Sequence, residues 1–146
     1  MDWITATGQL ILSALLGSTI GWEREKLHKA AGYRTMSLIA LGVTLFTLLS
    51  LYGFSGEVVV DPSRIAAQIV TGTGFLGAGV IIFKHDKVHN LTTAATIWVV
   101  AAIGMSVGVG WYGLAVVATI ITLVILLIVR KLTPRFEVEA NSSEHE

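Results

Sequence analysis

The sequence predicts an all-α integral membrane protein, a bundle of five transmembrane helices with the N-terminus outside and the C-terminus in the cytoplasm. Two observations carry this prediction. The chain of 146 residues is 53% hydrophobic and only 14% charged, whereas a soluble domain carries about 25% charged residues. The charged residues are also confined to short segments between long uncharged runs, and nine of the ten Lys and Arg residues fall in alternate segments.

The first three uncharged runs each have the length of one membrane-spanning helix. A helix needs about 20 apolar residues to cross a hydrocarbon core about 30 Å thick. Spans are therefore predicted at residues 3–22, 35–54 and 65–83. The third is preceded by Asp61 and Pro62, a helix start in which aspartate caps and proline suits the first turn.

The fourth uncharged run extends over 42 residues, from 88 to 129. This length is too great for one span and suits two spans joined by a tight turn. Glycines in the stretch 108–113 supply the bend, and the aromatic residues between them suit the headgroup region. The predicted spans are 92–107 and 111–129. Residues 1–132 thus form the transmembrane domain, and the polar residues 133–146 form a disordered cytoplasmic tail.

The orientation follows from the basic residues between the spans, because cytoplasmic loops carry an excess of Lys and Arg. The nine on one side are Arg24, Lys26, Lys29 and Arg34 after the first span, Lys84 and Lys87 after the third, and Arg130, Lys131 and Arg135 after the fifth. Only Arg64 falls on the other side. We therefore expect a multi-pass protein with the N-terminus outside.

Several functional classes have no support in the sequence. Net charge is zero and no long basic stretch occurs, so nucleic acid is not an expected partner. No nucleophile and base arrangement indicates an enzyme, and no cofactor is expected. The glycine pattern of 72–77 matches a dinucleotide fingerprint but lies inside an apolar run rather than a βαβ unit. His85, Asp86 and His89 fit a solvated loop better than a metal site, because two histidines four apart need a further ligand.

Glycines predict close helix packing. In lipid, small residues let helix backbones approach one another. The predicted packing glycines are Gly17 and Gly21 in the first span, Gly74, Gly77 and Gly79 in the third, and Gly104 and Gly108 in the fourth. A partner within the same chain is the simpler expectation, although a second copy would serve equally.

Two polar clusters remain as candidate sites. Near the outer end of the third span, Arg64 and Gln68 share one helix face and should turn into the bundle, with Asp61 as the nearest partner. They serve either a structural hydrogen bond or a functional pathway. The cytoplasmic cluster comprises Glu23, Arg24, Arg34, Asn90, Thr92 and Thr93. It serves either to cap and pair the helix ends, the favoured reading, or to bind a small anion or a metal.

Five blocks of the sequence resemble a known family. They are 17–25, 31–35, 61–68, 74–81 and 91–98, and in this order they resemble the MgtC/SapB family of bacterial inner-membrane proteins over about residues 8–110. The resemblance implies five helices with the N-terminus outside and a role in magnesium homeostasis, stress adaptation and virulence. Asn90 stands where many members have glycine. Longer members carry a soluble C-terminal domain. This sequence resembles the short form of the family, which is expected to act without that domain.

The resemblance implies a membrane regulator or adaptor that acts through helix contacts in the bacterial inner membrane. The resemblance adds a membrane ATPase as a partner, and we further expect contacts with the lipid bilayer and with a second copy of the chain in a homo-oligomer such as a dimer. The alternative is a small-ion transporter or channel, with Arg64 and Gln68 at one end of the path and the Glu23 cluster at the other. A structural scaffold ranks third. Mid-span polar residues are mostly Ser and Thr, which can bond to their own helix, so regulation is favoured.

Overall fold

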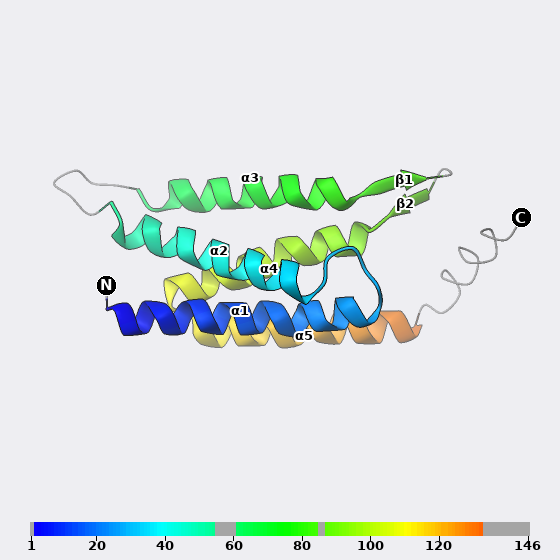
Figure 1. Ribbon diagram of the computed structural model, residues 1–146, viewed down its shortest axis with the longest axis horizontal. Helices are drawn as coiled ribbons and strands as arrows, with labels where there is room; N and C mark the ends of the chain where they lie inside the picture. Colours follow the sequence, from blue (N-terminus) through cyan, green and yellow to red (C-terminus); the bar gives the residue numbers. More distant parts are fainter. Residues whose placement is uncertain (1, 55–60, 85–86, 133–146) are drawn as a thin grey trace, which may run out of the picture.

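The structure is a computed structural model, and it describes residues 2–54, 61–84 and 87–132, with side chains as far as residue 128. These residues form five helices and one hairpin that lie along a common long axis (Figure 1). The elements in chain order are α1 (Trp3–Lys26), α2 (Tyr33–Tyr52), α3 (Ser63–Val80), β1 (Ile82–Lys84), β2 (Lys87–His89), α4 (Leu91–Val109) and α5 (Tyr112–Leu132). The all-α prediction is confirmed.

Helix α4 is the central element, because it contacts each of the other four helices. It buries Ile97, Val100, Ile103 and Val107 in the main core, together with Met36 of α2. Helix α1 packs against α2, α4 and α5, whereas α3 contacts α4 more extensively than α2. The result is a closed group of helices with α3 attached along one side (Figure 1).

Two tight connections set the position of α4. Asn90 precedes the helix in the left-handed conformation, with φ of 65°, and its side-chain amide donates to the carbonyl of Val80 at 3.1 Å. Asparagine tolerates this conformation where glycine would otherwise be expected, so the turn survives the substitution. At the other end, Gly110 has φ of 92° and starts the turn into α5.

The third predicted span extends too far at its C-terminal end. Helix α3 stops at Val80, and residues 82–84 pair with 87–89 in an antiparallel hairpin, with Phe83 opposite Val88. The apolar run continues through Ile82 and Phe83, so the absence of charge did not mark the end of the helix. Both residues belong to types that favour strands, which explains the hairpin.

Other helix ends differ by a few residues from the prediction. Helix α1 continues to Lys26, four residues beyond its predicted end, and α2 runs from residue 33 to 52 rather than from 35 to 54. The α4–α5 turn is tighter than expected, because α4 includes Gly108 and Val109. The predicted tail 133–146 lies outside the described residues.

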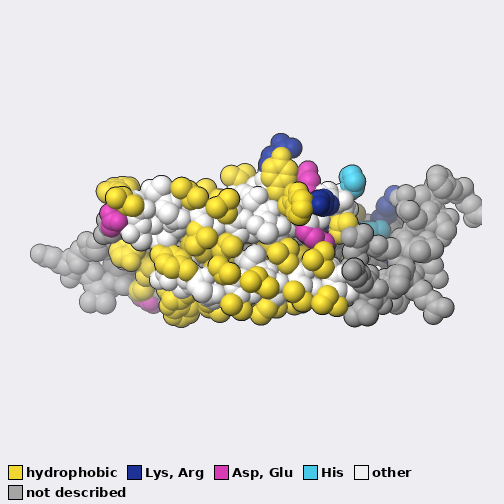
Figure 2. All heavy atoms as spheres, turned by 90° about the horizontal axis from the view of Figure 1, so that it is seen from below, with side chains coloured by type: hydrophobic (Ala, Val, Ile, Leu, Met, Phe, Trp, Pro, Cys, Tyr) yellow, Lys and Arg dark blue, Asp and Glu magenta, His cyan; other side chains and the backbone are white. Residues whose placement is uncertain are grey.

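The surface supports a membrane protein. Figure 2 shows hydrophobic side chains along the whole length of the described part, with Lys, Arg and His gathered toward one end. Helices α1, α2 and α4 are long and apolar enough to cross a membrane, and Tyr112–Ile128 is a shorter apolar helix. Large apolar residues such as Ile4 and Phe75 are at least 80% exposed, which water would penalise and lipid would not. The count of five spans and the orientation stay predictions.

Candidate functional site

A buried ion pair lies in the last turns of α1. The Nε atom of Arg24 donates to Oε2 of Glu23 at 2.7 Å, and Nη2 donates to Oε1 at 3.4 Å. The two residues are only 7% and 4% exposed, for Glu23 and Arg24 respectively. This fork-like contact satisfies both carboxylate oxygens and cancels two charges that would be costly to bury singly. The pair is therefore a closed, neutral unit.

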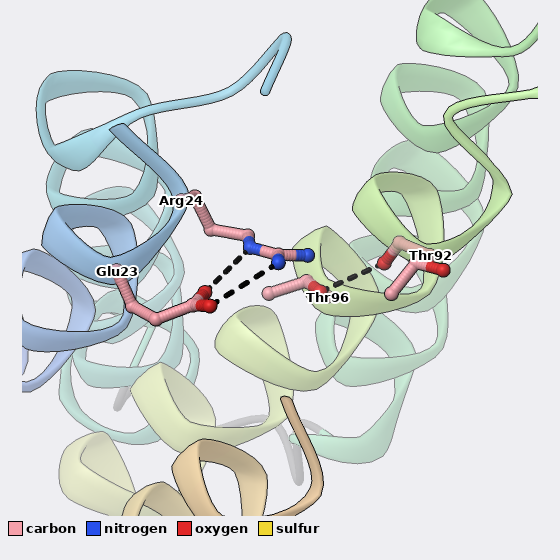
Figure 3. Close-up of polar contacts among 4 residues, drawn as sticks. All are labelled: Glu23, Arg24, Thr92 and Thr96. Atoms are coloured by element: carbon pink, nitrogen blue, oxygen red, sulfur yellow. Dashed lines mark hydrogen bonds and ion pairs between the residues drawn. The ribbon is translucent and has the colours of Figure 1, made fainter. Parts of the chain in front are cut away.

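The surroundings of this pair come from two other helices. Figure 3 shows the Arg24 guanidinium pointing toward Thr96 in the first turns of α4. The Thr96 hydroxyl donates to the carbonyl of Thr92 at 2.7 Å, so it is already bonded within its own helix. The start of α2 covers α1 closely, because a Cβ at Gly21 would collide with the backbone of Tyr33. The pair is thus enclosed by the starts of α2 and α4.

The structure separates the other members of the predicted cytoplasmic cluster. Thr93 is buried, but Thr92 and Arg34 are exposed, and the Arg34 guanidinium lies 5.9 Å from the Tyr33 ring centre. The ion pair joins neighbours on one helix rather than two helices. No group of three or more His, Cys, Asp or Glu that could hold a metal occurs within residues 2–54, 61–84 and 87–128; His85 and Asp86 lie outside them.

A shallow polar pocket of about 470 Å³ lies beside the α1–α2 connection. Its lining includes Glu25, Lys29 and Arg34, which are charged, and His28. Glu25, His28 and Arg34 are exposed, and charges of both signs are mixed. Solvated groups of mixed sign interact weakly, so this pocket does not define a ligand.

A second hollow, an apolar groove of about 960 Å³, lies between α2 and α3. We call it the α2–α3 groove. Its lining runs from Thr35 to Leu49 of α2 and from Ile65 to Val80 of α3, and it includes Phe54 just beyond α2 and Ile97 of α4. Thr73 in its wall donates to the carbonyl of Ile69 at 2.7 Å. No hydrogen bond between described residues involves the side chain of Gln68, which also lines the groove.

The prediction that Arg64 and Gln68 turn into the bundle is wrong for the single chain, since both side chains are exposed. Helix α3 buries Ile69, Thr73 and Gly77, which places Arg64 on the opposite side of the helix. Asp61 and Arg64 do not form an ion pair within 4 Å in the described part of the chain. The packing of α3 on α4 thus decides which way the polar residues point.

Asp61 instead caps the start of α3. Its carboxylate accepts from the backbone N–H of Ser63 at 2.9 Å and from the Ser63 hydroxyl at 2.7 Å. These bonds, the hydroxyl first, hold the pKa of Asp61 below its ordinary value, and the nearby positive charge of Arg64 adds to them. Asp61 therefore stabilises the start of α3 through Ser63, but the helix begins later than expected, at Ser63, with Pro62 in the N-cap position instead of the first helical one.

Glycines fall into two groups. A Cβ at Gly17 would lie 2.6 Å from the Met36 carbonyl oxygen, at Gly104 2.5 Å from that of Ala40, and at Gly108 2.7 Å from Cβ of Thr47. These glycines, with Gly21, pack helices within the chain. In α3, a Cβ at Gly77 would lie 3.5 Å from the Ala94 carbonyl oxygen, an ordinary contact, whereas at Gly74 and Gly79 it would meet nothing within 4 Å among the described residues. The described residues thus do not supply the close contacts expected for Gly74 and Gly79.

Three inter-helix hydrogen bonds were not anticipated from the sequence. The Gln9 amide donates to the carbonyl of Val107 at 2.8 Å, the Thr44 hydroxyl to that of Gly104 at 2.7 Å, and the Ser50 hydroxyl to that of Pro62 at 2.8 Å. These bonds join α1 to α4, α2 to α4, and α2 to the start of α3. Gln9 could have been noticed, because an amide inside an uncharged span needs a partner. Its partner is remote in sequence and leaves no local signal.

Comparison with known proteins identifies relatives. The model of the MgtC family matches residues 10–135. The chain is 48% identical over 132 residues to "Putative magnesium transporter YhiD" of Escherichia coli K12, covering 87% of this chain and 61% of that protein. It is 43% identical to "Protein MgtC" of Brucella abortus strain 2308, covering 86% and 52%, and 42% identical to "Protein MgtC" of Salmonella typhimurium, covering 94% and 58%.

These matches establish the family of the chain, but they cover only part of each relative. The chain spans between about half and six-tenths of the length of these relatives. No solved structure matches it. The family match nevertheless includes all of α2, α3, α4 and α5 and most of α1. The chain belongs to the MgtC family.

Proposed function

We propose that this protein is a multi-pass inner-membrane regulator, linked to magnesium homeostasis and stress adaptation, that acts through contacts between helices in the bilayer. Its five helices each cross the membrane, with the N-terminus outside. The observation that carries this proposal is the contrast between a closed helix bundle and the open α2–α3 groove. A long apolar groove at a lipid-facing surface suits a transmembrane helix, because helix association in lipid depends on packing of complementary surfaces.

The interior of the bundle supports regulation over transport. An ion path needs polar groups that are free to replace the water around the ion. The buried hydroxyls of Thr47, Thr73, Thr96 and Thr119 donate to carbonyls of their own helices instead. None of the buried polar side-chain atoms in the described residues lacks a partner. The buried ion pair is also neutral and enclosed, so it offers no vacant charge.

Transport is the second candidate, and two facts favour it. A relative at 48% identity carries the name of a putative magnesium transporter, and a charged pair is buried within the bundle. If the pair separated, Glu23 would present a carboxylate, the ligand type that magnesium prefers. Regulation of a membrane ATPase, by contrast, requires only the outer surface.

A growth assay with a filled groove tests the regulatory proposal. Gly42 lines the α2–α3 groove, and a Cβ there would meet nothing within 4 Å. Gly42→Leu should therefore fill the groove without disturbing the bundle, and it should abolish support of growth at low magnesium in a host that lacks its own family member. Gly8→Leu is the matched control, because Gly8 is exposed on α1 and is equally open. Full growth with Gly42→Leu would place the activity elsewhere.

Liposomes separate the two candidates. Purified protein in vesicles that contain a magnesium-sensitive dye should give no magnesium influx above that of empty vesicles. Membranes that contain the wild-type protein should instead yield a co-purifying membrane protein that Gly42→Leu loses and Gly8→Leu retains. Magnesium influx that Glu23→Gln eliminates would establish transport and overturn the regulatory proposal.

A further inference from the structure

One face of α3 is left exposed by the described residues. We call it the α3 seam, and it consists of Arg64, Gln68, Gly72, Phe75 and Gly79. Spacings of three and four residues place these five on one side of the helix. All are exposed, and Phe75 is 80% exposed. The seam borders the α2–α3 groove, because two of its residues, Gln68 and Gly72, also line the groove.

Lipid is a poor cover for this seam. Gln68 lies five residues into α3, about 7 Å below the helix start, and its amide offers two donors and one acceptor oxygen. No hydrogen bond between described residues satisfies them, and acyl chains provide none. The seam therefore calls for a protein partner that carries both donors and acceptors at the same depth.

The shape of the seam is complementary to itself. Phe75 projects from the helix between two glycines, three residues after Gly72 and four before Gly79. A Cβ at either glycine would meet nothing within 4 Å, so each leaves a space beside the projecting ring. When two such helices lie side by side and parallel, the ring of each can fill the space of the other, as an isologous contact requires.

The polar residues of the seam obey the same symmetry. Around a two-fold axis along the membrane normal, each Gln68 lies at the depth of its copy, and one amide can donate to the other's carbonyl. At the outer end, Asp61 and Arg64 carry opposite charges three residues apart. Neither forms an ion pair with another residue in the described part of the chain, so each can meet the opposite charge of the second copy.

We propose that the α3 seam binds a second copy of this chain in a parallel, two-fold dimer. This proposal rests on the proposed function and deepens it, because it names the first of the helix contacts through which the protein acts. The second copy also covers one wall of the α2–α3 groove. The groove is then bounded by both copies, and a regulated partner would contact the dimer rather than a monomer.

Disulfide trapping tests the seam, since the chain contains no cysteine of its own. Gly72→Cys and Gly74→Cys are matched variants: both glycines are exposed on α3, both are open, and they face opposite sides of the helix. After copper-catalysed oxidation of membranes that contain the full chain, Gly72→Cys should form a disulfide-linked dimer. Gly74→Cys should stay monomeric. Absence of a Gly72→Cys dimer, or an equal yield from Gly74→Cys, would overturn the proposal.

A second measurement uses association in detergent. Phe75→Ala should raise the dimer dissociation constant about tenfold, because it removes the group that fills the glycine spaces. Phe83→Ala is the control, since Phe83 is equally exposed but lies in β1. Equal constants for both variants would also overturn the seam. If the dimer is absent while Gly42→Leu still abolishes growth, the seam proposal is wrong and the regulatory proposal stands. If the dimer forms but Gly42→Leu grows normally, the regulatory proposal is wrong and the seam proposal stands.

Discussion

The α1–α2–α4 core and the outer side of α3 place glycines in different surroundings. In the core, Ala40 of α2 is enclosed by two glycines, because a Cβ at Gly17 would lie 2.9 Å from its Cβ and one at Gly104 would lie 2.5 Å from its carbonyl oxygen. On α3, a Cβ at Gly72 or at Gly79 would meet nothing within 4 Å among the described residues. The difference teaches that a glycine-rich helix does not reveal whether its partner is internal or external.

Removing one charge from the core should give the largest effect. Arg24→Ala leaves the Glu23 carboxylate buried without its partner, and we expect a loss of about 3–5 kcal/mol of unfolding free energy. Thermal unfolding in detergent measures it. Arg34→Ala, at an exposed site, should unfold like the wild type. The double variant Glu23→Leu with Arg24→Leu should recover most of the loss, and failure to do so would assign the pair a role beyond charge balance.

Adding one methyl group distinguishes the two sets of glycines. Gly104→Ala forces α2 away from α4 and should cost about 1–3 kcal/mol. Gly79→Ala has open space around it and should be neutral or stabilising by up to about 1 kcal/mol, because alanine favours the helix. Unfolding of both variants as monomers checks the comparison. A large loss for Gly79→Ala in the monomer would show an internal contact for α3.

A single hydroxyl should have a smaller effect. Thr44→Val keeps the shape of the side chain but removes the bond between α2 and the Gly104 carbonyl, for an expected loss of about 0.6–1.7 kcal/mol. Thr122→Val is the matched change, since Thr122 bonds only to Ala118 of its own helix at 2.7 Å. The difference between the two melting temperatures measures the inter-helix bond. Equal melting temperatures would show that the bond between Thr44 and Gly104 does not stabilise the core.

The smallest effect concerns the start of α3. Because the folded-state pKa of Asp61 lies below its ordinary value of 3.8, its cap stabilises the helix above that value and is lost as pH falls through the lowered one. Ser63→Ala removes the largest cause of the shift and should raise the pKa of Asp61. Carboxyl NMR in micelles reports it. An unchanged pKa would mean that the Ser63 hydroxyl does not bond to Asp61 in solution.

The positions of the helices could be predicted from the distribution of charged residues. The features that depend on packing between helices could not. Charged residues delimit the uncharged runs, and five helices were found close to their predicted ranges. The hairpin at Ile82 was missed because an apolar strand and an apolar helix end look alike without their neighbours. Within α3, Gly77 and Gly79 are indistinguishable as letters, yet only Gly77 meets α4. The same contact between α3 and α4 turns the Arg64 side chain outward, and the sequence alone does not reveal it.

The central position of α4 constrains the order in which the protein is assembled during synthesis. In the most apolar 18-residue stretch of α4, 50% of the residues are buried, compared with 33% in that of α1. Because α1, α2 and α3 precede it in the chain, these helices reach the membrane without the neighbour that they all contact. Until α4 arrives, the Thr44 hydroxyl and the Gln9 amide have no inter-helix acceptor. Synthesis that pauses before α4 would therefore leave an incomplete bundle exposed to quality-control proteases.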